Sequence, residues 1–315
     1  MKKNNISSTL FTLLILSLLG CNSANSQAPS TEAVDQAAFN QYWYAGDAEL
    51  TRYELKQARY GEIHEGDAVL ILVTEDFWMD KQVKYEFGDR TAQVKPILKL
   101  NFTRKFFTGV YPYSMMTSIF TPIDPALATP KVTTSSQEWC GHTFSQLNLK
   151  KNKYEGILRS YFQNEGDENF SVDAVLLEDE IWTKIRLNPA TLPTGDIKII
   201  PGSQALRLRH REIIAEAAEA SLTRTTDPEL SESPLQTYTI RYKNFNRSLT
   251  ITFEQAFPHA IVGWTETGIS GFGPNAKPLK TTAVRTHVIK SPYWNKHGNE
   301  DAQLRKELGL NPANY

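Results

Sequence analysis

The sequence predicts a mainly β (α+β) fold, in which a curved antiparallel sheet forms a half-open barrel or a sandwich with a few covering helices. Two observations lead to this fold class. Many segments alternate apolar and polar residues with a period of two, and in residues 97–103 the apolar side chains of Leu98, Leu100 and Phe102 fall on one side. Only a few short stretches follow the helical period, so helices should cover the sheet rather than build it.

The first twenty residues, 1–20, have the parts of a secretory signal peptide. Two lysines precede an apolar run over residues 10–19, which is too short to span a membrane. The motif Leu18-Leu19-Gly20-Cys21 resembles the lipobox of bacterial lipoproteins. The resemblance implies cleavage before Cys21, a diacylglycerol on its sulfur and an acyl chain such as palmitate on the new N-terminus.

After this leader, the sequence predicts a tether and one folded domain. Residues 21–36 are small, polar and without periodicity, which is typical of a flexible tether. A short helix over 36–43 leads into a single β-rich domain over 37–315. The polar, proline-containing stretch 224–234 is either a surface loop or a boundary between two β-rich halves.

Strands are predicted wherever short alternating segments are bounded by turn residues. The predicted ranges are 48–55, 67–75, 81–88, 97–103, 113–120, 132–149, 154–163, 238–243, 248–253, 260–267 and 280–289. The proline-rich segment 121–130 is expected to be a loop.

Three further segments favour helix. Residues 173–187, between a cap at Ser171 and a stop at Pro189, have five residues at helical spacing: Val175, Leu176, Asp179, Trp182 and Arg186. Residues 212–222 are rich in alanine and have high helix propensity. Residues 299–308 end in a helix that Gly309 should terminate.

Composition excludes some classes of protein. Removal of residues 1–20 takes away two of the 34 lysines and arginines and none of the 35 acidic residues, which leaves a net charge of −3. This near-neutral balance gives no reason to expect binding of nucleic acid. A hydrophobic content of 40% is enough for a folded core and excludes disorder of the whole chain.

The sharpest local feature is the group Glu138, Cys140 and His142. On a strand these three side chains would project from one face. A thiol, an imidazole and a carboxylate are the residue types of a thiol nucleophile with its base and orienting acid, and they also suit a metal. Neighbours at i and i+2 lie about 6–7 Å apart on a strand, so direct contact needs a bend, which Gly141 could supply.

A structural interpretation of the same residues is favoured. Lipidation of Cys21 leaves Cys140 without an intramolecular partner, since the chain has 2 cysteines. A free cysteine commonly packs as a small buried hydrophobe, with His142 hydrogen-bonded locally.

The compact basic group Arg207, Arg209, His210 and Arg211 is a weaker candidate, for binding an anionic headgroup or phosphate. We expect it on an exposed strand. Arginines in such a place are more often solvated or paired with acidic residues, and this is the favoured interpretation.

The common catalytic and cofactor motifs are missing from the sequence. It contains no HExxH, G-x-S-x-G, P-loop, G-x-G-x-x-G, CxxC or EF-hand pattern. We therefore expect no metal and no cofactor, and a non-catalytic protein, although a catalytic site assembled from distant residues stays open.

The core from about residue 42 to 268 resembles a family of uncharacterised Gram-negative envelope lipoproteins. The residues that carry the resemblance are in the segments 60–66, 111–118, 135–142 and 177–183. Such chains are sometimes labelled septum formation inhibitor Maf, but the export signal stands where Maf proteins have their Ser-rich, Arg-bearing motif. The strand-rich body with a covering helix is also loosely similar to LolA-type lipoprotein carriers, whose half-open barrels hold acyl chains.

The leading functional hypothesis is a lipid-anchored, non-catalytic envelope protein. It would bind a hydrophobic or lipidic ligand, or a partner protein, in the curved sheet. The alternatives are an envelope structural or assembly factor, and a thiol-dependent enzyme using Cys140 and His142. The expected location is the bacterial cell envelope, at the outer membrane and facing the periplasm, with membrane contact through the N-terminal acyl chains.

Overall fold

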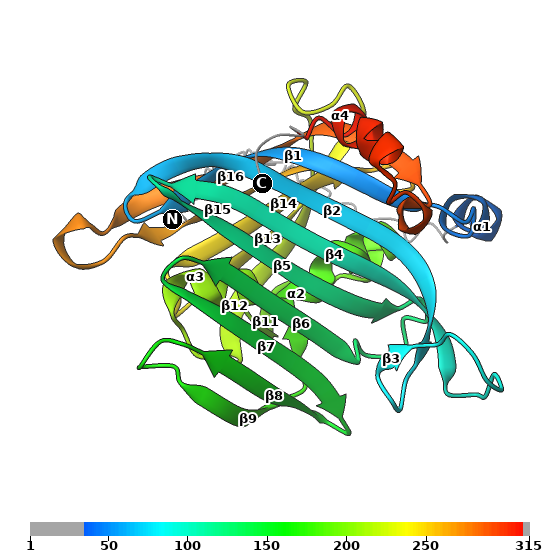
Figure 1. Ribbon diagram of the computed structural model, residues 1–315, viewed down its shortest axis with the longest axis horizontal. Coiled ribbons are helices and arrows are strands. Elements are labelled where there is room, and N and C mark those ends of the chain that lie inside the picture. The colour runs from blue at the N-terminus through cyan, green and yellow to red at the C-terminus, as the bar shows by residue number, and fades with distance from the viewer. Residues whose placement is uncertain (1–34, 311–315) are drawn as a thin grey trace, which may run out of the picture. The chain divides into compact units, whose positions relative to one another are not determined.

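The computed structural model describes residues 35–310, and these residues belong to one compact unit. The predicted signal peptide, Cys21 and nearly all of the predicted tether lie outside the described residues. The predicted fold class is confirmed: the chain is mostly β, with one large open antiparallel sheet and a few helices (Figure 1).

Sixteen strands build the sheet within residues 35–310. Their bounds are β1 Ala48–Arg59, β2 Glu62–Trp78, β3 Val83–Lys84, β4 Val94–Thr108, β5 Tyr111–Pro122, β6 Lys131–Glu138, β7 Gly141–Lys150, β8 Lys153–Ser160, β9 Asp167–Asp173, β10 Leu176–Leu177, β11 Gly195–Ile200, β12 Glu216–Thr225, β13 Leu235–Tyr242, β14 Arg247–Glu254, β15 Ile261–Ser270 and β16 Lys277–Ser291. Their order is β10-β11-β12-β13-β14-β15-β16-β1-β2-β4-β5-β6-β7-β8-β9, with β3 paired to β2. The sheet is antiparallel except for the short β10–β11 pair.

Helices cover both faces of this sheet. The α-helices of the described residues are α1 Gln36–Trp43, α2 Glu178–Leu187, α3 Ser203–Arg209 and α4 Gln303–Glu307. Short 3₁₀ turns lie at η1 Pro189–Thr191, η2 Gly273–Asn275, η3 Tyr293–Asn295 and η4 Asn299–Ala302. Helices α2 and α3 lie inside the curve of the sheet, and α4 lies on the outer side (Figure 1).

The core fills the space between the curved sheet and α2. Strand β4 shows why: Leu98, Leu100 and Phe102 are buried on its inner face, as the alternating sequence predicts. Rings then meet across the layers, since Trp182 of α2 lies 4.9 Å from Phe102 and 5.1 Å from Trp264 between ring centroids. Burial of such large apolar surfaces is the main stabilising term of the fold.

The Ala-rich segment predicted to be a helix is a strand instead. Residues 216–225 form β12, which pairs with β11 on one side and β13 on the other. Ala218 and Ala220 are buried while Ala217 and Glu219 are exposed. The helix prediction for 212–222 is wrong because the hydrogen bonds and apolar surface of two neighbouring strands outweigh a local propensity of less than about 1 kcal/mol per residue.

Three other boundaries differ from the predictions. The long strand predicted over 132–149 is a hairpin, β6 and β7, with a turn at residues 139–140. The strand predicted over 81–88 is reduced to the two residues of β3. Helix α2 begins at Glu178 rather than near Ser171, which lies in the unpredicted strand β9.

The stretch 224–234 connects two paired strands. Arg224 pairs with Gln236 and Thr225 pairs with Leu235 at the ends of β12 and β13. The sheet therefore continues across this stretch, and it is a hairpin loop rather than a break between two halves.

Six of the turns between consecutive strands lie at one end of the sheet. The turns β1–β2, β4–β5, β6–β7, β8–β9, β13–β14 and β15–β16 lie there together with α3, toward the left of Figure 1. Helix α1 lies at the opposite end, before the start of β1. Side chains from distant parts of the sequence therefore meet at this end.

Candidate functional site

The basic group predicted from the sequence lies on a buried helix. Arg207 and Arg209 belong to α3, and the expectation of an exposed strand is wrong. The helix ends at His210, whose left-handed φ of 51° turns the chain before Arg211. This segment is helical because Ser203–Arg209 consists largely of good helix formers, and because it packs its leucines against β5 and β6.

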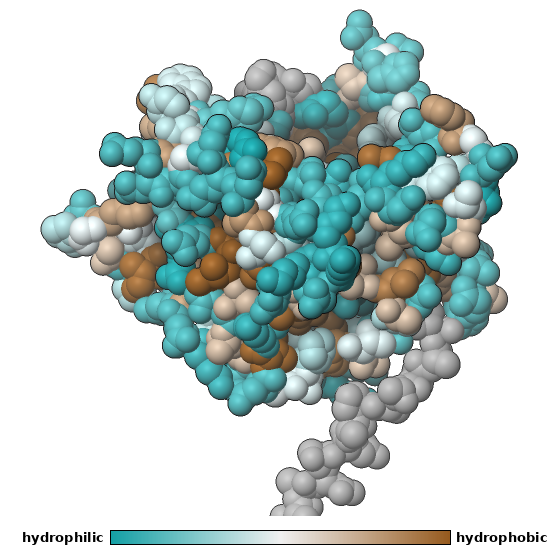
Figure 2. All heavy atoms as spheres, turned by 90° about the horizontal axis from the view of Figure 1, so that it is seen from below, coloured by the Kyte–Doolittle hydropathy of each residue, from teal (hydrophilic) through white to brown (hydrophobic). Residues whose placement is uncertain are grey.

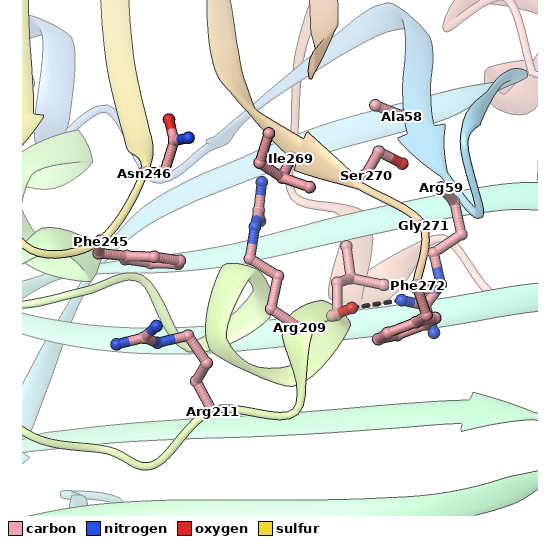
Figure 3. A pocket seen from close by; sticks show the side chains of 11 residues that line it. Ala58, Arg59, Arg209, Arg211, Phe245, Asn246, Ile269, Ser270, Gly271 and Phe272 are labelled. Carbon is pink, nitrogen blue, oxygen red and sulfur yellow. Dashed lines mark hydrogen bonds between the residues drawn. The ribbon is translucent and has the colours of Figure 1, made fainter. Parts of the chain in front are cut away.

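Beside α3 lies a cavity with a volume of about 270 Å³. It is lined by Ala58, Arg59, Leu208, Arg209, Arg211, Phe245, Asn246, Ile269, Ser270, Gly271 and Phe272. Figure 3 shows Arg209 in its middle, between Phe245 and Ile269, with Arg59 and Arg211 on either side. Three arginines thus contribute to the lining, and no carboxylate does.

Arg59 is held by neutral partners. It is the last residue of β1 and only 5% exposed. Its Nη2 donates to the hydroxyls of Tyr60 and Tyr113, each at 3.1 Å, and its Nη1 donates to the carbonyl of Leu208. Its guanidinium also stacks 4.1 Å from the centroid of the Tyr60 ring. Within residues 35–310 no carboxylate lies at ion-pair distance from it, so its charge is not neutralised.

Arg209 has still fewer partners. In the described part of the chain it makes no hydrogen bond or ion pair, and its guanidinium carbon lies 5.5 Å from the centroid of the Phe245 ring. Burial, together with the nearby charge of Arg247, lowers the pKa of Arg209 to about 10. The side chain still carries its charge at neutral pH.

Gly268 makes room for Arg209. A Cβ at Gly268 would lie 2.8 Å from Nη2 of Arg209 and 2.9 Å from the carbonyl oxygen of Asn246. Any larger residue there would displace the guanidinium or the strand.

The other basic residues of the group are already paired. Arg211 donates to Glu216 at 3.0 Å. Arg207 points away from the cavity, toward Glu138 and Glu165, each at 3.8 Å. His210 contacts Glu165 at 2.5 Å through Nδ1, and burial and the charge of Arg207 lower its pKa. Of the four predicted residues, the structure therefore brings Arg209 and Arg211 to the cavity and takes Arg207 and His210 elsewhere.

Beneath the cavity, a buried ionic network uses the nearest carboxylates. Glu266 accepts hydrogen bonds from Arg104 at 2.6 Å and from Arg247 at 2.9 Å. Arg247 also donates to Glu178 at 2.7 Å, and Glu178 accepts from the Tyr242 hydroxyl. Although burial alone would raise it, the two arginines hold the pKa of Glu266 well below its usual range. Glu178 and Glu266 are thus engaged by Arg104 and Arg247, and Arg209 remains without a partner carboxylate.

No protein-family model, curated protein or solved structure matches the chain. The resemblance to envelope lipoproteins and to LolA-type carriers therefore stays a prediction from the sequence.

The residues Glu138, Cys140 and His142 are not assembled as a strand would place them. Cys140 lies in the β6–β7 turn and is exposed, not buried as the favoured interpretation expected. Glu138 is turned inward, where it accepts from the backbone nitrogen of Cys140 at 2.8 Å and approaches Arg207. His142 pairs across the hairpin with Gln137, the neighbour of Glu138, so its side chain points to the opposite face. The thiol, the imidazole and the carboxylate have no shared site in this arrangement.

No group of three or more His, Cys, Asp or Glu side chains within residues 35–310 is placed to hold a metal ion. No helix in the same range is long and apolar enough to cross a membrane.

Sequence reasoning missed Arg59, Phe272 and Gly268. A signal for Arg59 exists, because Tyr53, Leu55, Gln57 and Arg59 follow the buried face of one strand at every second position. A basic residue on a buried face needs a partner, and that need points to a site. Phe272 and Gly268 carry no comparable signal, since only the fold brings β15 and the β15–β16 turn beside α3.

Proposed function

We propose that this chain is a non-catalytic, lipid-anchored envelope protein that binds an anionic group, a phosphate or a carboxylate, in the cavity between Arg59, Arg209 and Arg211. One observation carries the proposal. Arg59 and Arg209 face the cavity without a partner carboxylate in residues 35–310, and no carboxylate lines it. A planar guanidinium matches the oxygens of a phosphate or carboxylate, often through two parallel hydrogen bonds.

The position of the cavity sets where such a ligand would bind. The sequence led us to expect a hydrophobic ligand inside the curve of the sheet. That space is packed by α2 and by the buried rings of Phe102, Trp182 and Trp264. The proposal therefore places the charged part of the ligand at the end of the sheet. A volume of about 270 Å³ suits one charged group with a few attached atoms.

Arg209→Gln tests the proposal. Arg209 has no hydrogen-bonding partner in the described residues, so its replacement leaves no protein group unsatisfied. Loss of a charge-assisted hydrogen bond of about 1.5–3 kcal/mol should weaken binding of inorganic phosphate or acetate about tenfold or more. Isothermal titration calorimetry of the full-length protein measures the dissociation constants of both ligands.

Arg241→Gln is the matched control, since Arg241 is exposed on β13 and does not line the cavity. The control should bind as the wild type does. The proposal fails if the wild-type protein binds neither phosphate nor acetate at millimolar concentration, or if both variants lose binding equally.

The anchoring part of the proposal rests on the lipobox and has its own test. Cells that express the wild-type chain should incorporate labelled palmitate into the protein, and the Cys21→Ser variant should not. Equal labelling of the two chains would contradict lipidation at Cys21.

A further inference from the structure

Exposed aromatic side chains gather at the same end of the sheet as the basic cavity. We call them the aromatic rim: Tyr60 (37% exposed), Trp139 (69%), Tyr161 (78%) and Phe272 (55%). They come from four different turns, β1–β2, β6–β7, β8–β9 and β15–β16. Phe107 and Val110, at the β4–β5 turn of this same end, are also exposed, at 51% and 77%.

Ring contacts join the aromatic rim into one surface. Tyr60 lies 6.3 Å from Phe272 between centroids, and its hydroxyl accepts from Tyr111 at 3.2 Å. Tyr111 stacks on Trp139 at 6.3 Å. On the other side, Phe272 lies 6.2 Å from the ring of His210.

Further ring contacts connect His210 to Tyr161, the remaining residue of the aromatic rim. His210 packs 4.9 Å from Phe162, and Phe162 packs 6.1 Å from Tyr161. Exposed aromatic side chains that gather at one end of a sheet are a feature of binding surfaces.

The aromatic rim borders the cavity directly. Phe272 belongs to both, and Arg59, which lines the cavity, stacks on Tyr60. Figure 2 shows the face of the molecule seen from below, on which apolar side chains lie open to solvent among polar ones. Exposed rings thus surround a site with unneutralised positive charge.

We infer that this end of the sheet docks on an anionic lipid surface, with the aromatic rim in the interfacial region and a lipid headgroup phosphate at Arg59 and Arg209. The inference rests on the anion site proposed above and names the source of its anion. Tryptophan and tyrosine favour the membrane–water interface, because their rings are apolar and their N–H and O–H groups still reach water or headgroups. The arginines add attraction to anionic lipids.

Charge complementarity favours a bilayer as the occupant. The rim alone would suit any apolar partner, but the cavity adds cationic groups that no carboxylate of residues 35–310 neutralises. Twelve residues of β1 separate the rim from α1, which is about 40 Å of extended chain. The rim is therefore a contact surface distinct from the end at which the predicted tether joins the domain.

A fluorescent label on Cys140 provides the test, because this thiol is exposed in the same turn as Trp139. The full-length chain with Cys21→Ser keeps Cys140 as its single thiol and removes the acylation site. An environment-sensitive label is attached, and the protein is titrated with vesicles of phosphatidylcholine alone or mixed equally with phosphatidylglycerol. A second chain, with Cys140→Ser and Ser233→Cys added, carries the label in the loop at the other end of the sheet.

We expect a blue shift of the Cys140 label with the anionic vesicles and none of the Ser233→Cys label. Trp139→Ser should raise the lipid concentration at half-saturation about tenfold, since an exposed ring no longer enters the interface. It should leave phosphate binding unchanged, because Trp139 does not line the cavity. Arg209→Gln should remove the preference for phosphatidylglycerol.

Each contrary result has a distinct meaning. Phosphate binding without any shift of the Cys140 label overturns the membrane inference and leaves the anion site standing. Equal binding to both kinds of vesicle overturns the role of the headgroup at the arginines. A vesicle-dependent shift with no binding of phosphate or acetate overturns the anion site and, with it, the assignment of the headgroup.

Discussion

At the scale of single residues, the same side-chain type has different roles in different surroundings. Arg247 forms ion pairs with Glu178 and Glu266 through its two terminal nitrogens, and its removal would leave buried charges unpaired. Arg209 lies close by and has no such partner. The sequence alone cannot distinguish these two arginines, because their partners come from α2 and β15. Only the arginine without a partner is free to receive a ligand.

Asp179 provides a residue-scale prediction about pH. It lies in the first turn of α2 and accepts hydrogen bonds from Ser203, at 2.5 Å from the hydroxyl and 3.1 Å from the backbone nitrogen. Burial raises its pKa from 3.8 to about 6 despite these bonds, which link α2 to the start of α3. The folded state therefore binds the proton of Asp179 more tightly than the unfolded state does. Ionisation of this group lowers the free energy of unfolding of the protein as the pH rises from about 4 to 6.

Asp179→Asn should remove this loss. The free energy of unfolding of the variant, relative to wild type, should increase between pH 4 and pH 7 by up to about 3 kcal/mol. Urea denaturation at both pH values measures the difference. Asp89→Asn, in an exposed loop, is the control and should show no such change. A difference that stays constant or decreases with pH would refute the assignment.

At the scale of elements, neighbouring strands outweigh local propensity. The alanines of β12 favour helix in isolation, yet β11 and β13 offer hydrogen bonds to both of its edges. Strand β4 has no such conflict, since alternation and tertiary structure agree, and its inner face was correctly predicted. Helix α2 was predicted but begins later than expected, because residues 176–177 pair with β11.

Ala218 and Ala217 give a matched test of β12. The Cβ of Ala218 is fully buried, and the side chain of Ala217 is exposed on the opposite face. Ala218→Leu should lower the free energy of unfolding by about 1–3 kcal/mol through overpacking, and Ala217→Leu should leave it within about 0.5 kcal/mol. Chemical denaturation of both variants measures this. Similar effects of the two substitutions would contradict the strand.

At the scale of the described unit, one continuous sheet joins its first and last parts. Strand β1 lies in the middle of the sheet, between β16 from near the C-terminus and β2. Because β1 pairs with β16, segments far apart in the sequence belong to one cooperative structure. It also gathers turns from many parts of the sequence at one end, where the cavity and the aromatic rim lie.

Limited proteolysis tests this continuity. A cut in the loop 226–234 leaves β12 and β13 paired along eight positions. The two fragments should therefore elute together in size-exclusion chromatography and separate only in denaturant. Separate elution under native conditions would instead support two independent β-rich halves.

The periodicity of the sequence was enough to predict a mainly β fold and the buried residues of strands such as β4. These features depend on the spacing of apolar and polar residues that are close together in the chain, and this spacing can be read from the sequence. The sequence also pointed to Arg209 and Arg211, but with them to Arg207 and His210, and to a Cys140 group that the β6–β7 turn separates. Which arginines lack a partner, and which rings surround them, depends on contacts between residues far apart in the chain. Those contacts arise from the pairing order of the strands and from the packing of α2 and α3, so they became visible only in the folded structure.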